Sequence, residues 1–158
     1  LELIDEHIYL DPAIGLFVSN YEPDPMDGEY PGIQGDRKKK QILRRALGFY
    51  QLILGGEEFS IAGKKVTSAV MYRTGKYDSI YATYDFIFPD EGIRFYFDDE
   101  KLNHVTVRPS GTGNSLRFHI QLHAPVTKSD LLEKKLELMT EAKEIMNDLR
   151  RLLNAPKA

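Results

Sequence analysis

Residues 105–120, with the sequence VTVRPSGTGNSLRFHI, place one arginine on each side of a short loop of small residues. Arg108 stands before the loop and Arg117 stands after it. The hydroxyl groups of the loop come from Ser110, Thr112 and Ser115, and its glycines allow backbone N–H groups to point inward. Arginine binds phosphate through two parallel hydrogen bonds, and a concave set of N–H and O–H donors suits the same anion. The spacing alone fits both a phosphate site and an ordinary hairpin loop with solvated arginines.

The segments on either side of the loop alternate as strands do, with successive side chains on opposite faces. Before the loop, Val105 and Val107 point one way, and His104, Thr106 and Arg108 point the other. After the loop, the apolar set is Leu116, Phe118, Ile120 and Leu122, and the polar set is Arg117, His119, Gln121 and His123. If the two strands pair, both arginines lie together on the polar face or its rim. The histidines of this face lack a carboxylate partner, so we predict no metal site there.

Five segments have the period of two that strands show: residues 66–72, 81–88, 93–97, 105–107 and 116–122. A helix is predicted before them, with Asp36 as its N-cap and an end near Leu54, where Gly55-Gly56 follows. A second helix is predicted after them, with a capping box of Thr127 and Asp130, and runs to Leu153. Its predicted apolar stripe is Leu132, Leu136, Met139, Ala142, Ile145, Met146, Leu149 and Leu153. This order predicts an α+β fold, an antiparallel sheet with helices packed on one face.

The N-terminal part is less regular. We expect a short helix over residues 1–10, a strand over residues 13–18, and a long loop over residues 21–32, which is dense in Pro, Gly and acidic residues. The 158 residues are predicted to form a single domain, with residues 1–35 as this N-terminal part and residues 36–158 as the main body.

Composition narrows the function classes. The chain has no cysteine, so thiolate chemistry and cysteine-ligated zinc are excluded. The net charge of −3 argues against non-specific nucleic-acid binding. The basic run of residues 37–40, together with Arg44 and Arg45, is predicted to be a solvated helix face. The aromatic residues of the strands, among them Tyr84, Phe95 and Tyr96, are predicted to be core rather than a stacking platform for RNA. No apolar run has membrane-spanning length and no signal peptide leads the chain, so we expect a cytoplasmic protein.

The string Arg-Pro-Ser-Gly-Thr at residues 108–112, with Arg117 and a strand after it, resembles the phosphate-binding loop of the α-D-phosphohexomutase superfamily. This superfamily includes phosphoglucomutases and phosphomannomutases. Residues 32–36, 61–66 and 90–95 are similar, more loosely, to parts of the family's fourth, C-terminal domain. The resemblance implies a fold similar to the TATA-binding protein. It also implies that this chain is a fragment of a larger multidomain enzyme.

Carried over from the family, one set of residues would cradle the phosphate of a hexose phosphate that is not being transferred: Arg108, Ser110, Gly111 and Thr112, with Arg117 as a second cation. The expected rim of this cradle is Gly113, Asn114, Ser115 and His119. The chain departs from the family pattern at Gly113-Asn114, where Glu-Pro is usual. A glycine after the threonine also occurs in glucose-type members, which slightly favours phosphoglucomutase.

The family's chemistry also needs a phosphorylated serine, an aspartate-rich magnesium loop and a sugar-selecting loop, and none of these motifs occurs in the sequence. The resemblance therefore implies no catalytic residue, no metal site and no cofactor in this chain, and magnesium only in the full-length enzyme. Its expected partners are the hexose phosphate and the other domains of the enzyme, with no nucleic acid and no membrane. Residues 98–100 are acidic but lack the spacing of a metal loop, so we predict a turn between strands. The alternatives are a stand-alone module that binds phosphate or a sugar phosphate without catalysis, and an RNA-binding sheet.

Overall fold

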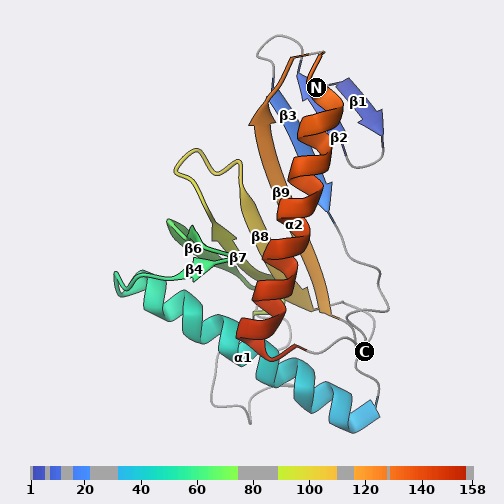
Figure 1. The fold of residues 1–158 in the computed structure, drawn as a ribbon. Coiled ribbons are helices and arrows are strands. Elements are labelled where there is room, and N and C mark those ends of the chain that lie inside the picture. The colour runs from blue at the N-terminus through green and yellow to red at the C-terminus, as the bar shows by residue number, and fades with distance from the viewer. Residues whose placement is uncertain are drawn as a thin grey trace.

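The computed structural model describes the backbone of residues 2–5, 8–11 and 16–21. It describes backbone and side chains of residues 32–74, 89–109, 116–127 and 129–155, apart from the Asp36 side chain. These residues form one seven-stranded antiparallel sheet in the order β1-β2-β3-β9-β8-β7-β6, a small two-stranded sheet β4-β5, and two helices (Figure 1). The predicted α+β class is confirmed.

The elements follow one another along the chain as β1 (Glu2–Asp5), β2 (Ile8–Asp11), β3 (Leu16–Tyr21), α1 (Gly32–Leu54), β4 (Ser60–Ile61), β5 (Lys64–Lys65), β6 (Ser68–Tyr72), β7 (Gly92–Tyr96), β8 (His104–Pro109), β9 (Leu116–Pro125) and α2 (Leu131–Leu153). The strands predicted near residues 66–72, 93–97, 105–107 and 116–122 are therefore confirmed, with boundaries shifted by a few residues. The strand predicted over residues 81–88 lies outside the described residues.

The hydrophobic core lies between the sheet and the two helices. The buried side chains of β7, β8 and β9, such as Phe95, Val107 and Phe118, belong to one apolar cluster with residues of both helices. Figure 1 shows α2 lying along β9, while α1 crosses the sheet near β6 and β7. The prediction that the helices pack on one face of the sheet is confirmed by this shared core. Phe95 is fully buried in it, as predicted for the aromatic residues of the strands.

The prediction of a helix over residues 1–10 was wrong. The described residues of this segment form β1 and β2, which pair with each other, and β2 pairs with β3. β3 in turn pairs with β9 from Leu16↔Pro125 to Tyr21↔Ile120, so it begins and ends three residues later than predicted. The long strand β9 offers a free edge to β3, and pairing along this edge decides the structure of a segment too short to form a stable isolated helix.

Helix α1 ends where the sequence indicates but begins earlier. At its C-terminus Gly56 has a φ of 83°, and the N–H of Glu57 donates to the carbonyl of Leu52 at 3.0 Å. This is the left-handed end that glycine favours. The helix begins at Gly32 rather than after the predicted N-cap Asp36. In this first turn Gly35 is buried, whereas Gly32, Ile33 and Gln34 are exposed.

The basic run on α1 is mostly solvated, as predicted. Arg37, Arg44 and Arg45 are exposed, whereas Lys39 has only 6% of its surface exposed. The prediction of a solvated face is therefore wrong for Lys39 alone among these positions.

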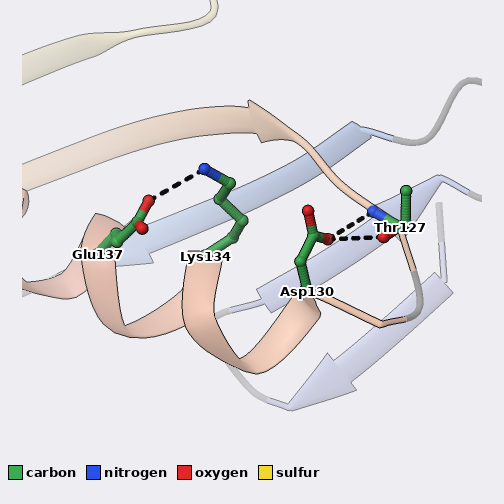
Figure 2. Close-up of polar contacts among 4 residues, drawn as sticks. All are labelled: Thr127, Asp130, Lys134 and Glu137. Atoms are coloured by element: carbon green, nitrogen blue, oxygen red, sulfur yellow. Dashed lines mark hydrogen bonds and ion pairs between the residues drawn. The ribbon is translucent and has the colours of Figure 1, made fainter.

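At the start of α2, half of the predicted capping box is present (Figure 2). Asp130 Oδ1 accepts hydrogen bonds from the Thr127 backbone N–H at 2.7 Å and from the Thr127 hydroxyl at 3.0 Å. The reciprocal hydrogen bond of the box is missing. The helix begins at Leu131, and Asp130 occupies the N-cap position without a side-chain capping hydrogen bond. The prediction of Thr127 as the N-cap was therefore wrong, because its hydroxyl bonds to the Asp130 carboxylate instead of the backbone.

The apolar stripe of α2 is confirmed over its second half and wrong over its first. Ala142, Ile145, Met146, Leu149 and Leu153 are buried. Leu132 and Leu136, however, have 75% and 66% of their surface exposed, and Leu138 is buried in their place. Both sets fit a helical period, so the sequence alone could not distinguish the stripe that meets the sheet.

Candidate functional site

The two arginines singled out in the sequence stand directly opposite each other in the sheet. In the β8–β9 ladder, Val107 pairs with Phe118, Arg108 with Arg117, and Pro109 with Leu116. Val107 and Phe118 point into the core, so the arginines point to the face without helices. Both arginine side chains are exposed. The predicted pairing of the two arginines at the end of a hairpin is therefore confirmed.

This arginine pair has no counter-charge within the described part of the chain. Neither Arg108 nor Arg117 forms a hydrogen bond or an ion pair to another described residue. Like charges directly opposite each other destabilise a strand pair. A bound anion would therefore reduce the repulsion between the two guanidinium groups.

The loop between the arginines is outside the described residues. This applies to Ser110, Gly111, Thr112, Gly113, Asn114 and Ser115. Their predicted roles as cradle and rim stay predictions. His119 of the predicted rim is described: it is half-buried on β9, opposite Thr106 and two residues beyond Arg117 on the same face.

Gly92, which was not singled out in the sequence, packs closely against β8 at Val107 and Arg108. Gly92, at the start of β7, has a φ of 99°, and a Cβ atom added to it would lie 2.6 Å from the Val107 carbonyl oxygen and 2.7 Å from the Arg108 Cβ. No other residue type fits this approach without displacing β8. Gly92 also closes the turn over residues 89–92, because its N–H donates to the Pro89 carbonyl at 3.0 Å.

Arg94 is a third arginine on the same face, and it was also missed. It pairs with Thr106 in the β7–β8 ladder, and its Nε donates to the Thr106 hydroxyl at 2.8 Å. Its guanidinium lies over the Tyr72 ring, 5.5 Å from the ring centroid. The signal was available, because Arg94 and Tyr96 alternate with Ile93 and Phe95 in a predicted strand.

Two tyrosines complete the surroundings of Arg94. Burial raises the pKa of Tyr96, but a hydrogen bond from Tyr72, a hydrogen bond from Arg94 and the charges of Arg94 and Lys101 outweigh it, so the net pKa is lowered. The Lys101 ammonium lies 5.5 Å from the Tyr96 ring centroid. Tyr96 has only 7% of its surface exposed, so it is closed to the base stacking that an RNA-binding sheet requires.

Two histidines of this face, His104 and His119, lie side by side, and His104 is deeply buried. His104 has 5% of its surface exposed, and its ring centroid lies 6.2 Å from that of His119. Burial lowers the pKa of His104 to about 4, helped by the charges of Arg94 and His119 and opposed by that of Asp98. The Nδ1 atoms of His104 and His123 are buried without a hydrogen-bond partner in the described residues. His104 is therefore neutral at pH 7.

Within the described residues, no group of histidines and carboxylates is arranged to hold a metal ion. Asp98, the first residue of the acidic run, accepts hydrogen bonds from the backbone N–H groups of Leu102 and Asn103. The predicted turn at residues 98–100 is thereby confirmed. In the same part of the chain, no helix combines the length and apolar character that a bilayer span requires.

Comparison with known proteins gives no match to a family model and no match to a curated protein. The resemblance to phosphohexomutases therefore rests on the motif and its setting.

Proposed function

We propose that this chain is the phosphate-binding C-terminal domain of a phosphohexomutase, a phosphoglucomutase or phosphomannomutase. In this role it holds the phosphate of a hexose phosphate that is not being transferred. The observation that supports the proposal best is the Arg108↔Arg117 pairing: two exposed guanidinium groups directly opposite each other, at the two ends of the Arg-Pro-Ser-Gly-Thr loop. Two planar forks on one small surface suit an oxyanion with several oxygens.

In the proposed enzyme this domain contributes binding energy rather than chemistry. Contacts to the distal phosphate orient the sugar so that its other end meets the reacting groups of the remaining domains. The magnesium ion and the phosphoserine belong to those domains, and the resemblance implies them for the whole enzyme only. A cytoplasmic location and a fold similar to the TATA-binding protein are parts of the same proposal. The isolated chain is expected to have no mutase activity, with or without added magnesium.

The alternative is a stand-alone module that binds phosphate or a sugar phosphate without catalysis. The arginine pair fits both functions equally. The sequence that adjoins residue 1 in the gene distinguishes them, because a serine loop and an aspartate-rich metal loop upstream belong to the mutase alone.

The arginine pair is tested by titrating the protein with inorganic phosphate and with a hexose phosphate while recording amide NMR spectra. We expect weak, salt-dependent binding that is reduced roughly ten- to a hundredfold in Arg108→Lys, because an ammonium group cannot replace the planar fork. Arg108→Ala and Arg117→Ala should be non-additive in a double-mutant cycle, since they share one ligand.

Arg37→Ala is the matched control, because Arg37 is an exposed arginine on α1. It should leave phosphate affinity unchanged. The proposal is wrong if Arg108→Lys binds phosphate like the wild type, or if the arginine changes alter the unfolding temperature and not the affinity.

A further inference from the structure

Arg94 lies at the centre of a second polar group on the helix-free face, which we call the Arg94 cluster. Its members are Tyr72, Arg94, Tyr96, Lys101, His104 and Thr106. The described partners of Arg94 are neutral: the Thr106 hydroxyl, the Tyr96 hydroxyl and the face of the Tyr72 ring. These contacts fix the plane of the guanidinium, and the guanidinium has more N–H groups than the two hydroxyl oxygens use.

The positive charge of the cluster is uncompensated within the described residues. Arg94 and Lys101 form no ion pair there. The nearest acidic influence on His104 is Asp98, whose two carboxylate oxygens already accept the N–H groups of Leu102 and Asn103. Arg94 is only partly exposed, so water screens its charge incompletely. A half-buried cation without a counter-ion is a costly arrangement that a bound anion offsets.

A buried nitrogen in the same cluster also lacks a partner. His104 Nδ1 is buried and has no hydrogen-bond partner among the described residues. Unsatisfied buried polar atoms are expected where an ion or a water molecule completes a site.

From these contacts we infer that the Arg94 cluster is an oxyanion-binding subsite, which takes a phosphate or carboxylate group of a ligand. The subsite is distinct from the arginine pair. Arg94 pairs with Thr106, so Arg108 is its diagonal neighbour on β8. The Cα atoms of such neighbours lie about 7–8 Å apart. A ligand with two acidic groups would therefore reach both subsites at once. The inference does not depend on the phosphohexomutase proposal, because each subsite has its own arginines.

His104 reports on the occupancy of this subsite. The groups that act on its imidazole are Arg94 on β7, His119 on β9 and Asp98 in the turn after β7. Its pKa of about 4 is set first by burial and then by the charge of Arg94. An anion seated on Arg94 would cancel part of that charge, and the imidazolium of His104 would form more readily. Binding should therefore raise the pKa of His104.

The experiment follows the His104 ring resonances by NMR between pH 3 and pH 6 in the presence of inorganic phosphate. A parallel series uses trifluoroacetate, a carboxylate that stays ionised in acid, and sodium chloride at equal ionic strength corrects for screening. We expect phosphate to raise the pKa of His104. A response to trifluoroacetate as well assigns the subsite to carboxylate and phosphate groups alike, whereas a response to phosphate alone assigns it to phosphate.

Three variants locate the anion. Arg94→Gln should raise the phosphate concentration needed for the response at least tenfold. This is about the effect of losing one charge-assisted hydrogen bond. Arg37→Gln, which removes the same charge on α1, should leave it intact, and Arg108→Gln shows whether an anion on the arginine pair contributes to it. If Arg94→Gln does not fold, Arg94→Lys keeps the charge and lacks the fork, and should still show weakened binding.

The inference fails if phosphate leaves the His104 resonances of the wild type unchanged, or if a folded Arg94 variant responds like the wild type. If Arg108→Gln abolishes the response and Arg94→Gln does not, the anion lies on the arginine pair. The subsite is then disproved while the proposed function stands. If phosphate does not bind at the arginine pair but still shifts the His104 resonances, the proposed function is disproved while the subsite stands.

Discussion

Gly92 brings the backbone of β7 closer to Arg108 than any residue with a Cβ atom could. The added atom would lie 2.6 Å from a carbonyl oxygen and 2.7 Å from the Arg108 Cβ, and the φ of 99° is itself unfavourable for other residues. The contact involves backbone atoms, which cannot move aside as the end of a flexible side chain can. The position of Arg108 therefore depends on Gly92, which has no side chain of its own to contact a ligand.

Gly92→Ala should destabilise the protein by about 2–4 kcal/mol, from the left-handed backbone and the clash together. Gly48→Ala is the matched control, because Gly48 lies inside α1 and an added Cβ would meet nothing within 4 Å. That change should stabilise the protein by roughly 0.5–1 kcal/mol. Urea unfolding of the three proteins measures both effects. Equal stabilities for Gly92→Ala and the wild type would mean that β7 and β8 lie farther apart than described here.

Single residues on this face could be predicted where a pattern marks them. Strand alternation placed Arg108 and Arg117 together, because period-two patterning fixes the face of each side chain. The same rule applies to Arg94, yet no glycine-rich loop with a second arginine adjoins it, so it was not singled out. The burial of His104 could not be predicted either, since it depends on neighbours from other strands, such as Tyr96 and His119.

At the scale of elements, helix α2 has two overlapping apolar stripes, and only contact with the sheet distinguishes them. Leu138 is 5% exposed and belongs to the core, whereas Leu136 is 66% exposed. Elements with a strong local signal were predicted well, such as the end of α1 at Gly55-Gly56 and the strands of the β8–β9 hairpin. Elements that depend on distant pairing were not, such as β1 and β2, which extend the sheet through β3.

Leu138→Ala should cost about 2–5 kcal/mol, because it opens a cavity in a packed core. Leu136→Ala makes the same chemical change on the same helix and should alter stability by no more than about 0.5 kcal/mol. Thermal and urea unfolding of both variants test which stripe meets the sheet. A larger loss for Leu136→Ala would reverse the orientation assigned to the first half of α2.

At the scale of the whole molecule, the β4–β5 hairpin is fastened to α2 across a long stretch of sequence. The N–H of Ala62 donates to Asp148 Oδ2 at 2.6 Å, and Lys64 forms an ion pair with Glu141. Ala62 has a φ of 52° and Gly63 a φ of 75°, which form the tight turn between β4 and β5. A non-glycine residue in this left-handed conformation is held by its surroundings, and the Asp148 carboxylate is the partner that holds it.

Asp148→Asn tests this link through its pH dependence. The hydrogen bond from the Ala62 backbone lowers the pKa of Asp148, and so does Arg151, while burial opposes them. Because the folded-state pKa lies below the ordinary value, the stabilisation is fully present above the unfolded pKa of about 4 and is lost as the pH falls through the folded pKa. Asparagine keeps an acceptor oxygen but not the charge, so the variant should be less stable by about 1 kcal/mol at pH 7. This difference should shrink below pH 4, where the wild-type carboxylate also becomes neutral.

Asp99→Asn, which changes an exposed carboxylate in a turn, is the control and should show no such dependence. Urea unfolding at pH 7, 5 and 3 gives the three differences, and a gap between wild type and Asp148→Asn that stays constant down to pH 3 would mean that the Asp148 charge does not stabilise the hairpin.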